Sequence, residues 1–133
     1  MEKKELQKKY AEFQLLQQQL QELQKQLQML EEQLVETAYT QQTLDELKSL
    51  PVGSEILVPV SSGIYAKATL GLTDELLVNV GSGAAVMKSV EGTKSMLDSQ
   101  LDEVQKLRLQ LLQVARQVEE QLLSLRKEII GEG

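Results

Sequence analysis

Residues 20–34 read LQELQKQLQMLEEQL, and this stretch decides the class of fold. Its leucines recur in alternating steps of three and four residues: Leu20, Leu23, Leu27, Leu30 and Leu34. That heptad spacing lines them along one side of a helix, where they pack against a second helix in a coiled coil. The remaining residues are Gln, Glu, Lys and Met, which are good helix formers. The stretch therefore predicts a coiled-coil helix.

The predicted helix extends well beyond this stretch. Residues 3–48 contain no Gly or Pro, and Leu50 precedes Pro51. A residue before proline is disfavoured in helical conformation, so we expect the helix to end near Ser49. A rise of 1.5 Å per residue then gives a rod of roughly 65–70 Å. Upstream, Tyr10, Phe13 and Leu16 continue the apolar pattern with two successive steps of three, which predicts a slip in the heptad.

A second helix is predicted over residues 90–130. Ser89 is a suitable N-cap, and the negative charge of Glu91 in the first turn interacts favourably with the helix dipole. Apolar residues again recur at threes and fours: Leu97, Leu101, Val104, Leu107, Leu111, Val114, Val118, Leu122, Leu125 and Ile129. Two helices of similar length most simply fold back on each other, which brings both chain ends together roughly 60–70 Å from the segment between them.

The segment between the helices, residues 51–89, has a different composition. Val, Ile, Ala, Thr and Gly replace Gln and Glu, and apolar residues alternate in short runs around Ser61–Gly63 and Gly81–Gly83. This pattern predicts two consecutive β-hairpins. Pro59 cannot donate a ladder hydrogen bond, so its strand should be an edge or carry a bulge. Four short strands leave open edges, which favours pairing with other chains.

The composition excludes most catalytic and cofactor chemistry. The chain has no His and no Cys, so the usual general base, thiolate chemistry and the commonest metal ligands are missing. The Gly81–Gly83 turn has Val86 where a dinucleotide-binding loop requires a third glycine. We therefore expect no enzyme activity, no cofactor and no bound metal.

Charge and hydropathy limit the classes of partner and the cellular compartment that we expect. The net charge of −6 disfavours nucleic acid as a partner, because a nucleic-acid binder normally presents a basic surface. There is no apolar signal-peptide run and no stretch long enough to span a membrane. We expect a cytoplasmic protein that binds no nucleic acid and no membrane.

Large apolar residues of both helices are expected at the end of the rod that carries the chain termini. They are Leu6, Tyr10, Phe13, Leu16, Leu122, Leu123, Leu125, Ile129 and Ile130. One interpretation is that they close the end as an ordinary two-helix interface. The other is that the helices mismatch there and leave apolar surface for a bound protein. Periodicity leaves both interpretations open.

The layout of helix, two hairpins and matching helix resembles the α-class subunit of prefoldin, the hexameric co-chaperone. Two motifs carry the resemblance most sharply. The first is Ile56-Leu57-Val58-Pro59-Val60 with the turn at 61–63 and Tyr65-Ala66-Lys67-Ala68; the second is Leu77-Val78-Asn79-Val80-Gly81-Ser82-Gly83 continuing to Val86. β-class subunits have a single hairpin, so the paired hairpins favour the α class. The short tails look more like an archaeal subunit than a eukaryotic one.

The resemblance implies an α+β fold: a long antiparallel two-helix coiled coil with two consecutive β-hairpins that join an oligomeric β-barrel. It implies a single prefoldin-like domain over residues 1–133, with helices at 3–49 and 90–130 and hairpins at 51–89. It further implies assembly of two α-type with four β-type subunits through hairpin residues, which here are Ile56, Val58, Val60, Ile64, Ala66, Leu76, Val78, Val80 and Val86.

The resemblance also implies a function. Prefoldins hold unfolded client proteins at their coiled-coil tips without ATP and pass them to a group II chaperonin. The matching tip residues here are Leu6, Tyr10, Phe13, Leu16, Leu122, Leu125, Ile129 and Ile130. The alternative function is a structural coiled-coil adaptor that joins specific partners and ignores unfolded chains. An RNA-binding arm is a third class, which the acidic balance disfavours.

Overall fold

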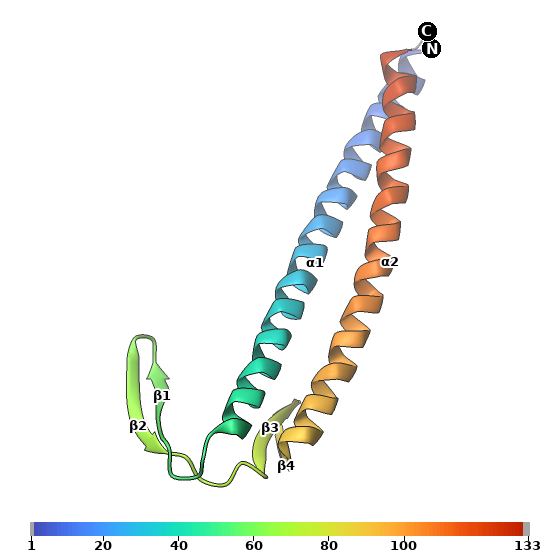
Figure 1. The fold of residues 1–133 in the computed structure, drawn as a ribbon. Coiled ribbons are helices and arrows are strands. Elements are labelled where there is room, and N and C mark those ends of the chain that lie inside the picture. Colours follow the sequence, from blue (N-terminus) through green and yellow to red (C-terminus); the bar gives the residue numbers. More distant parts are fainter. Residues whose placement is uncertain (1, 132–133) are drawn as a thin grey trace. The chain divides into compact units, whose positions relative to one another are not determined.

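The computed structural model describes residues 2–131; Met1, Glu132 and Gly133 of the predicted domain lie outside the described residues. The elements in chain order are α1 (Lys3–Ser49), β1 (Glu55–Ser61), β2 (Ile64–Thr69), β3 (Leu76–Gly81), β4 (Ala84–Lys88) and α2 (Val90–Ile130) (Figure 1). The strands form two separate antiparallel pairs, β1–β2 and β3–β4. The predicted fold class of two long helices with two hairpins between them is confirmed.

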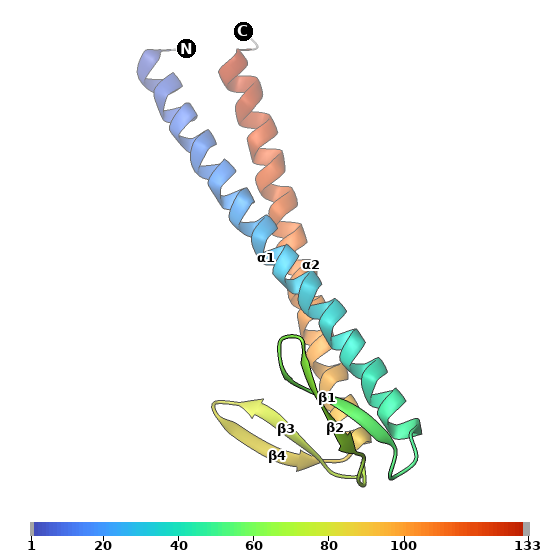
Figure 2. The same cartoon turned by 90° about the vertical axis from the view of Figure 1, so that its left-hand side faces the viewer.

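The chain divides into two compact units. The described residues of unit 1 are 2–35 and 102–131, which are the first part of α1 and most of α2. Within this unit the two helices run antiparallel, so that the start of α1 and the end of α2 lie at the same end of the unit (Figures 1 and 2). Unit 2, residues 36–101, holds the end of α1, both hairpins and the start of α2.

Both helix ends beside the hairpins follow the predicted signals. The helix α1 ends at Ser49, before Leu50 and Pro51. Ser89 caps α2, because the backbone N–H of Gly92 donates to the Ser89 Oγ atom at 2.9 Å. The local sequence therefore positions the boundaries between helix and hairpin.

One line of buried and half-buried side chains holds the helices of unit 1 together, and we call it the seam. On α1 the seam consists of Leu6, Lys9, Phe13, Leu16, Leu20, Leu23, Leu27, Leu30 and Leu34. On α2 it consists of Val104, Arg108, Leu111, Ala115, Val118, Leu122, Leu125 and Ile129. In both helices steps of three and four alternate without a break, as in a regular coiled coil.

The predicted heptad slip in α1 is wrong. Lys9, and not Tyr10, fills the seam position between Leu6 and Phe13; Tyr10 is 52% exposed. The lysine side chain is only 29% exposed, because its aliphatic stem lies along the seam while its charged end reaches the edge. The apolar pattern suggested a slip because one seam position is occupied by a charged residue.

The predicted positions of Leu107 and Val114 in the α2 seam are also wrong. Both are exposed, by 44% and 42%, and the neighbouring Arg108 and Ala115 take their places. Successive helix residues differ by about 100° in direction, so a single-residue shift moves a side chain from the seam to its flank. The strict heptad decides which of two adjacent residues is buried.

Basic residues of both units bond to acidic residues on the facing helix. In unit 1, Lys9 Nζ lies 3.1 Å from Glu128 Oε2, and an Arg108 guanidinium nitrogen lies 3.3 Å from Glu31 Oε1. In unit 2, Lys94 Nζ lies 2.5 Å from Asp45 Oδ1. Because each cation comes from one helix and its acid from the other, these pairs specify the antiparallel register.

We expect the Arg108→Leu variant to melt at a higher temperature than the natural chain. The Nε atom of Arg108 is buried with no hydrogen-bond partner among the described residues, which costs free energy. Leucine removes this cost and fills a heptad position, and we expect a gain of about 1 kcal/mol in the free energy of unfolding. Circular dichroism at 222 nm measures the melting temperature, and a lower value for the variant would contradict this account.

Candidate binding surfaces

Each hairpin is a two-stranded ribbon with a bulge beside its turn. In the first hairpin Val58 pairs with Ala66, and the register shifts between Pro59 and Ser61. In the second, Val78 pairs with Val86, and the register shifts between Asn79 and Gly81. The prediction that the proline strand is an edge or carries a bulge is confirmed, because the bulge follows Pro59 directly.

The second hairpin closes through a turn that needs left-handed backbone. Ser82 and Gly83 have φ angles of 53° and 75°. Two successive positive φ values are typical of a type I′ turn, whose twist matches that of the flanking strands. The Gly81–Gly83 sequence thus forms a hairpin turn, as predicted, and not a phosphate-binding loop.

The residues predicted for assembly leave much apolar surface uncovered. Ile56, Leu76 and Val78 are half-buried; Val58, Val60, Ile64, Ala66, Val80 and Val86 are exposed. Val60 in β1 is 66% exposed. Leu77, which lies on the opposite face of β3 from Leu76 and Val78, is 71% exposed. Among the described residues each strand pairs with one neighbour, so every strand also has an open edge. Two-stranded sheets are marginal in water, and this surface is therefore suited to being covered by other strands.

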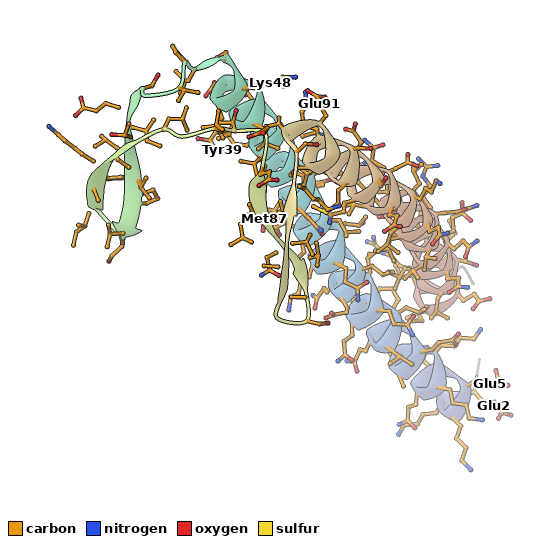
Figure 3. All side chains as sticks on the ribbon, turned by 90° about the horizontal axis from the view of Figure 1, so that it is seen from below. Glu2, Glu5, Tyr39, Lys48, Met87 and Glu91 are labelled. Carbon is orange, nitrogen blue, oxygen red and sulfur yellow. The ribbon has the colours of Figure 1, made fainter. Side chains whose placement is uncertain are left out.

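An ion pair joins the two helix ends next to the hairpins. Lys48, in the last turn of α1, donates to Glu91, in the first turn of α2 (Figure 3). The hydrogen bond and charge of Lys48 lower the pKa of Glu91 below its ordinary value of 4.5. The pair between Lys94 and Asp45 raises the pKa of Lys94, mainly through the hydrogen bond to Asp45. Both pairs favour the charged forms near neutral pH.

The lowered pKa of Glu91 predicts how stability depends on pH. A folded-state pKa below the unfolded one adds stability above pH 4.5, and that stability is lost as the pH falls through the folded-state pKa. We expect the natural chain to melt at a higher temperature than the Glu91→Gln variant at pH 6, and this difference to vanish once the pH has fallen below the folded-state pKa of Glu91, which lies below 4.5. Melts of both proteins at several pH values measure it; a difference that persists unchanged at low pH would contradict the assignment.

The second candidate surface is the end of unit 1 that holds the start of α1 and the end of α2, residues 2–16 and 121–131, which we call the tip. Here the eight residues predicted to contact clients divide into two groups. Leu125 is buried at 7% exposure, and Leu6, Phe13, Leu16, Leu122 and Ile129 are half-buried in the seam. Tyr10 and Ile130 point outward and are 52% and 70% exposed. Client binding by these residues stays a prediction, but most of them also seal the two helices together.

Two hollows lie at the tip. One, of about 670 Å³, is on α2 alone and is lined by Leu123, Arg126, Lys127, Ile130 and Gly131. The other, of about 300 Å³, is lined from both helices by Lys9, Glu12, Leu16, Gln121, Ser124, Leu125 and Glu128. The first is apolar with two cations; the second is polar and apolar in about equal parts.

Two exposed leucines at the tip were absent from the eight residues predicted to contact clients, although Leu123 was among the apolar residues expected at this end. Leu15 is 56% exposed and Leu123 is 59% exposed. Both fall outside the heptad, next to seam positions Leu16 and Leu122. The signal that could have identified them is an apolar residue that breaks the three-four spacing, because such a residue cannot be buried in the seam.

Residues 2–131 offer neither a metal site nor a membrane span. No group of three or more Asp or Glu side chains is placed to hold a metal ion in this part of the chain. Neither described helix contains an apolar stretch that could cross a membrane.

Comparison with known proteins identifies relatives of this chain. A family model described as prefoldin subunit matches residues 16–130. The prefoldin subunit alpha of Pyrococcus horikoshii is 33% identical over 101 residues, which cover 75% of this chain and 68% of that protein. The prefoldin subunit alpha of Methanopyrus kandleri is 36% identical over 109 residues, which cover 82% of this chain and 69% of that protein.

A solved structure has the same fold. It is filamentous PFD from Methanocaldococcus jannaschii, determined by cryo-electron microscopy, with a TM-score of 0.79 and 22% sequence identity. The match covers 87% of this chain and 96% of that chain.

Proposed function

Because the chain belongs to the prefoldin family and groups with its α subunits, we propose that it is a subunit of an ATP-independent chaperone that holds unfolded proteins at its coiled-coil tips. Prefoldins are co-chaperones, and their α subunits assemble into oligomeric complexes. The proposal here concerns how this chain would take part: its hairpins join the subunits, and its tip contacts the client.

The observation that carries the proposal is the exposed apolar surface of the tip. Tyr10, Leu15, Leu123 and Ile130 are each more than half exposed on helices that already have a complete seam. Their exposure is not needed to hold the two helices together, and exposed apolar side chains without a partner in the chain are available to contact another protein. One such patch binds weakly, but several patches in one complex engage the same unfolded chain with much higher avidity. Weak individual contacts also let the client leave without nucleotide hydrolysis.

The hairpins support the assembly part of the proposal. Their apolar side chains and open strand edges would be covered when strands of other subunits pair with them. We propose a complex with β-type prefoldin subunits, two α with four β, that passes its clients to a group II chaperonin in the cytoplasm. The prediction of a single domain over residues 1–133 belongs to this proposal, with the hairpins and the coiled coil acting as one subunit.

The alternative of a structural adaptor differs in what it binds. An adaptor would recognise particular partners and ignore unrelated unfolded proteins. Exposed apolar side chains at the tip favour a chaperone, because an adaptor that used charged flanks for recognition would gain nothing from them.

We expect a double variant at the tip, Leu123→Ser with Ile130→Ser, to hold clients less well. The complex with β-type subunits is mixed with a chemically unfolded, unrelated protein, and light scattering follows aggregation without ATP. The variant loses two apolar contacts per α subunit. The concentration of complex that suppresses half of the aggregation should therefore rise by roughly threefold or more.

The matched control is Leu109→Ser, which removes a leucine of 62% exposure from α2 outside the tip. It should leave suppression unchanged. An equal loss in the control and the tip variant would contradict a tip site, and no suppression by the natural complex would favour the adaptor.

We also expect Val58→Lys in β1 to prevent assembly. The lysine would place a charge on the apolar face of the first hairpin. In the proposed complex, strands of another subunit cover this face and exclude water from it. Size-exclusion chromatography with light scattering should show separate subunits, while the helical circular dichroism remains. Ser62→Lys, in the turn, is the control and should assemble normally; normal assembly of Val58→Lys would contradict this role of the hairpin.

A further inference from the structure

The basic residues Arg126 and Lys127 of α2 are adjacent and both line the hollow on α2 at the tip. Five other cations of the two helices are paired: Lys9, Lys48, Lys94 and Arg108 bond to the facing helix, and Lys106 bonds to Asp102 one turn away. Lys3, Lys4, Lys8, Lys25 and Arg116 form no ion pair with the described residues. Arg126 and Lys127 form no ion pair with any residue that the structure describes. The positions three and four residues to either side of them hold Leu122, Leu123, Ser124, Ile129, Ile130 and Gly131, so neighbouring turns supply no carboxylate.

The two cations lie between the two exposed apolar side chains of the same hollow. Leu123, Arg126, Lys127 and Ile130 follow one another at steps of three, one and three residues, so they occupy one face of two helical turns. Leu123 and Ile130 are 59% and 70% exposed and belong to no part of the seam. We call these four residues the cationic patch.

The charge of the tip differs from that of the rest of the protein. The described tip residues, 2–16 and 121–131, carry six basic and four acidic side chains, although the whole chain has 14 basic and 20 acidic ones. An acidic ligand is therefore repelled by most of the coiled coil and attracted at the tip. A basic ligand has the opposite preference.

We propose that the cationic patch binds acidic amphipathic segments of polypeptide, in which carboxylates alternate with apolar side chains along a helix. Apolar side chains of the segment contact Leu123 and Ile130, while its carboxylates bond to Arg126 and Lys127. The guanidinium of Arg126 offers two parallel donors to a carboxylate, which gives the contact direction as well as strength. This inference rests on the proposed chaperone function and specifies which client segments the α tip selects.

Charge complementarity favours a polypeptide over other anionic partners. Two cations flanked by two large apolar side chains match a ligand that brings both carboxylates and apolar groups at helical spacing. Nucleic acid is a poor match, because its phosphates require a longer basic surface than two side chains.

Fluorescence anisotropy with labelled 14-residue peptides tests the proposal on the complete complex with β-type subunits. One peptide is an amphipathic Leu/Glu helix and the other has Lys at every Glu. We expect the acidic peptide to bind about tenfold more tightly than the basic one. The double variant Arg126→Gln with Lys127→Gln should abolish this preference. The control Lys106→Gln with Arg116→Gln, which removes two cations of α2 outside the tip, should retain it.

Four further results separate the possibilities. Equal binding of both peptides by the natural complex, or a preference that survives the Arg126 and Lys127 changes, would overturn the inference. Preferential binding of phosphatidylserine vesicles through the same two cations, without discrimination between peptides, would also overturn it. If the double variant still suppresses aggregation of a basic client, as expected, the chaperone function and the cationic patch are separable. If the natural complex suppresses no aggregation but discriminates the peptides, the chaperone proposal fails while the patch is retained.

Discussion

The register of the two antiparallel helices is the constraint on which the rest of the structure depends. Apolar heptads alone allow helices to slide by seven residues, since each leucine then meets another leucine. The seam cations remove this freedom. A shift by one heptad would place Arg108 opposite Gln24 or Ala38 in place of Glu31, and would place Lys9 opposite Gln121 in place of Glu128. The abundant glutamines contribute to the choice of register because they are uncharged and cannot form an ion pair with these cations. The present register places Glu31 next to Arg108 and Glu128 next to Lys9.

A register set in this way also decides what remains exposed. Once Lys9 and Arg108 occupy seam positions, the adjacent Tyr10 and Leu107 must lie on the flank. The charged residues cost some stability compared with leucine, yet they direct particular apolar side chains toward the outside. In this chain the exposed apolar surface and the ion pairs are two consequences of one arrangement.

The helices and the hairpins obtain their stability in different ways. Within unit 1 each helix covers the apolar side of the other, so the seam is complete within a single chain. The hairpins expose large apolar residues and pair only within themselves in the described part of the chain, so their surface is completed by association. A subunit of an oligomeric complex is expected to combine these two properties, and the family relationship agrees with that expectation.

The sequence by itself determined the element types, their order and their ends. Leucine periodicity defined the helices, alternation and glycine-containing turns defined the hairpins, and Pro51 and Ser89 marked the boundaries, because these signals act over a few neighbouring residues. The tertiary structure alone decided which of two adjacent residues is buried. Sequence spacing suggested Tyr10, Leu107 and Val114 for the interface, whereas the paired helices bury Lys9, Arg108 and Ala115 there. The physical reason is that a lysine or arginine can lay its aliphatic stem in the seam when an acid on the facing helix receives its charge, and that acid is far away in the sequence.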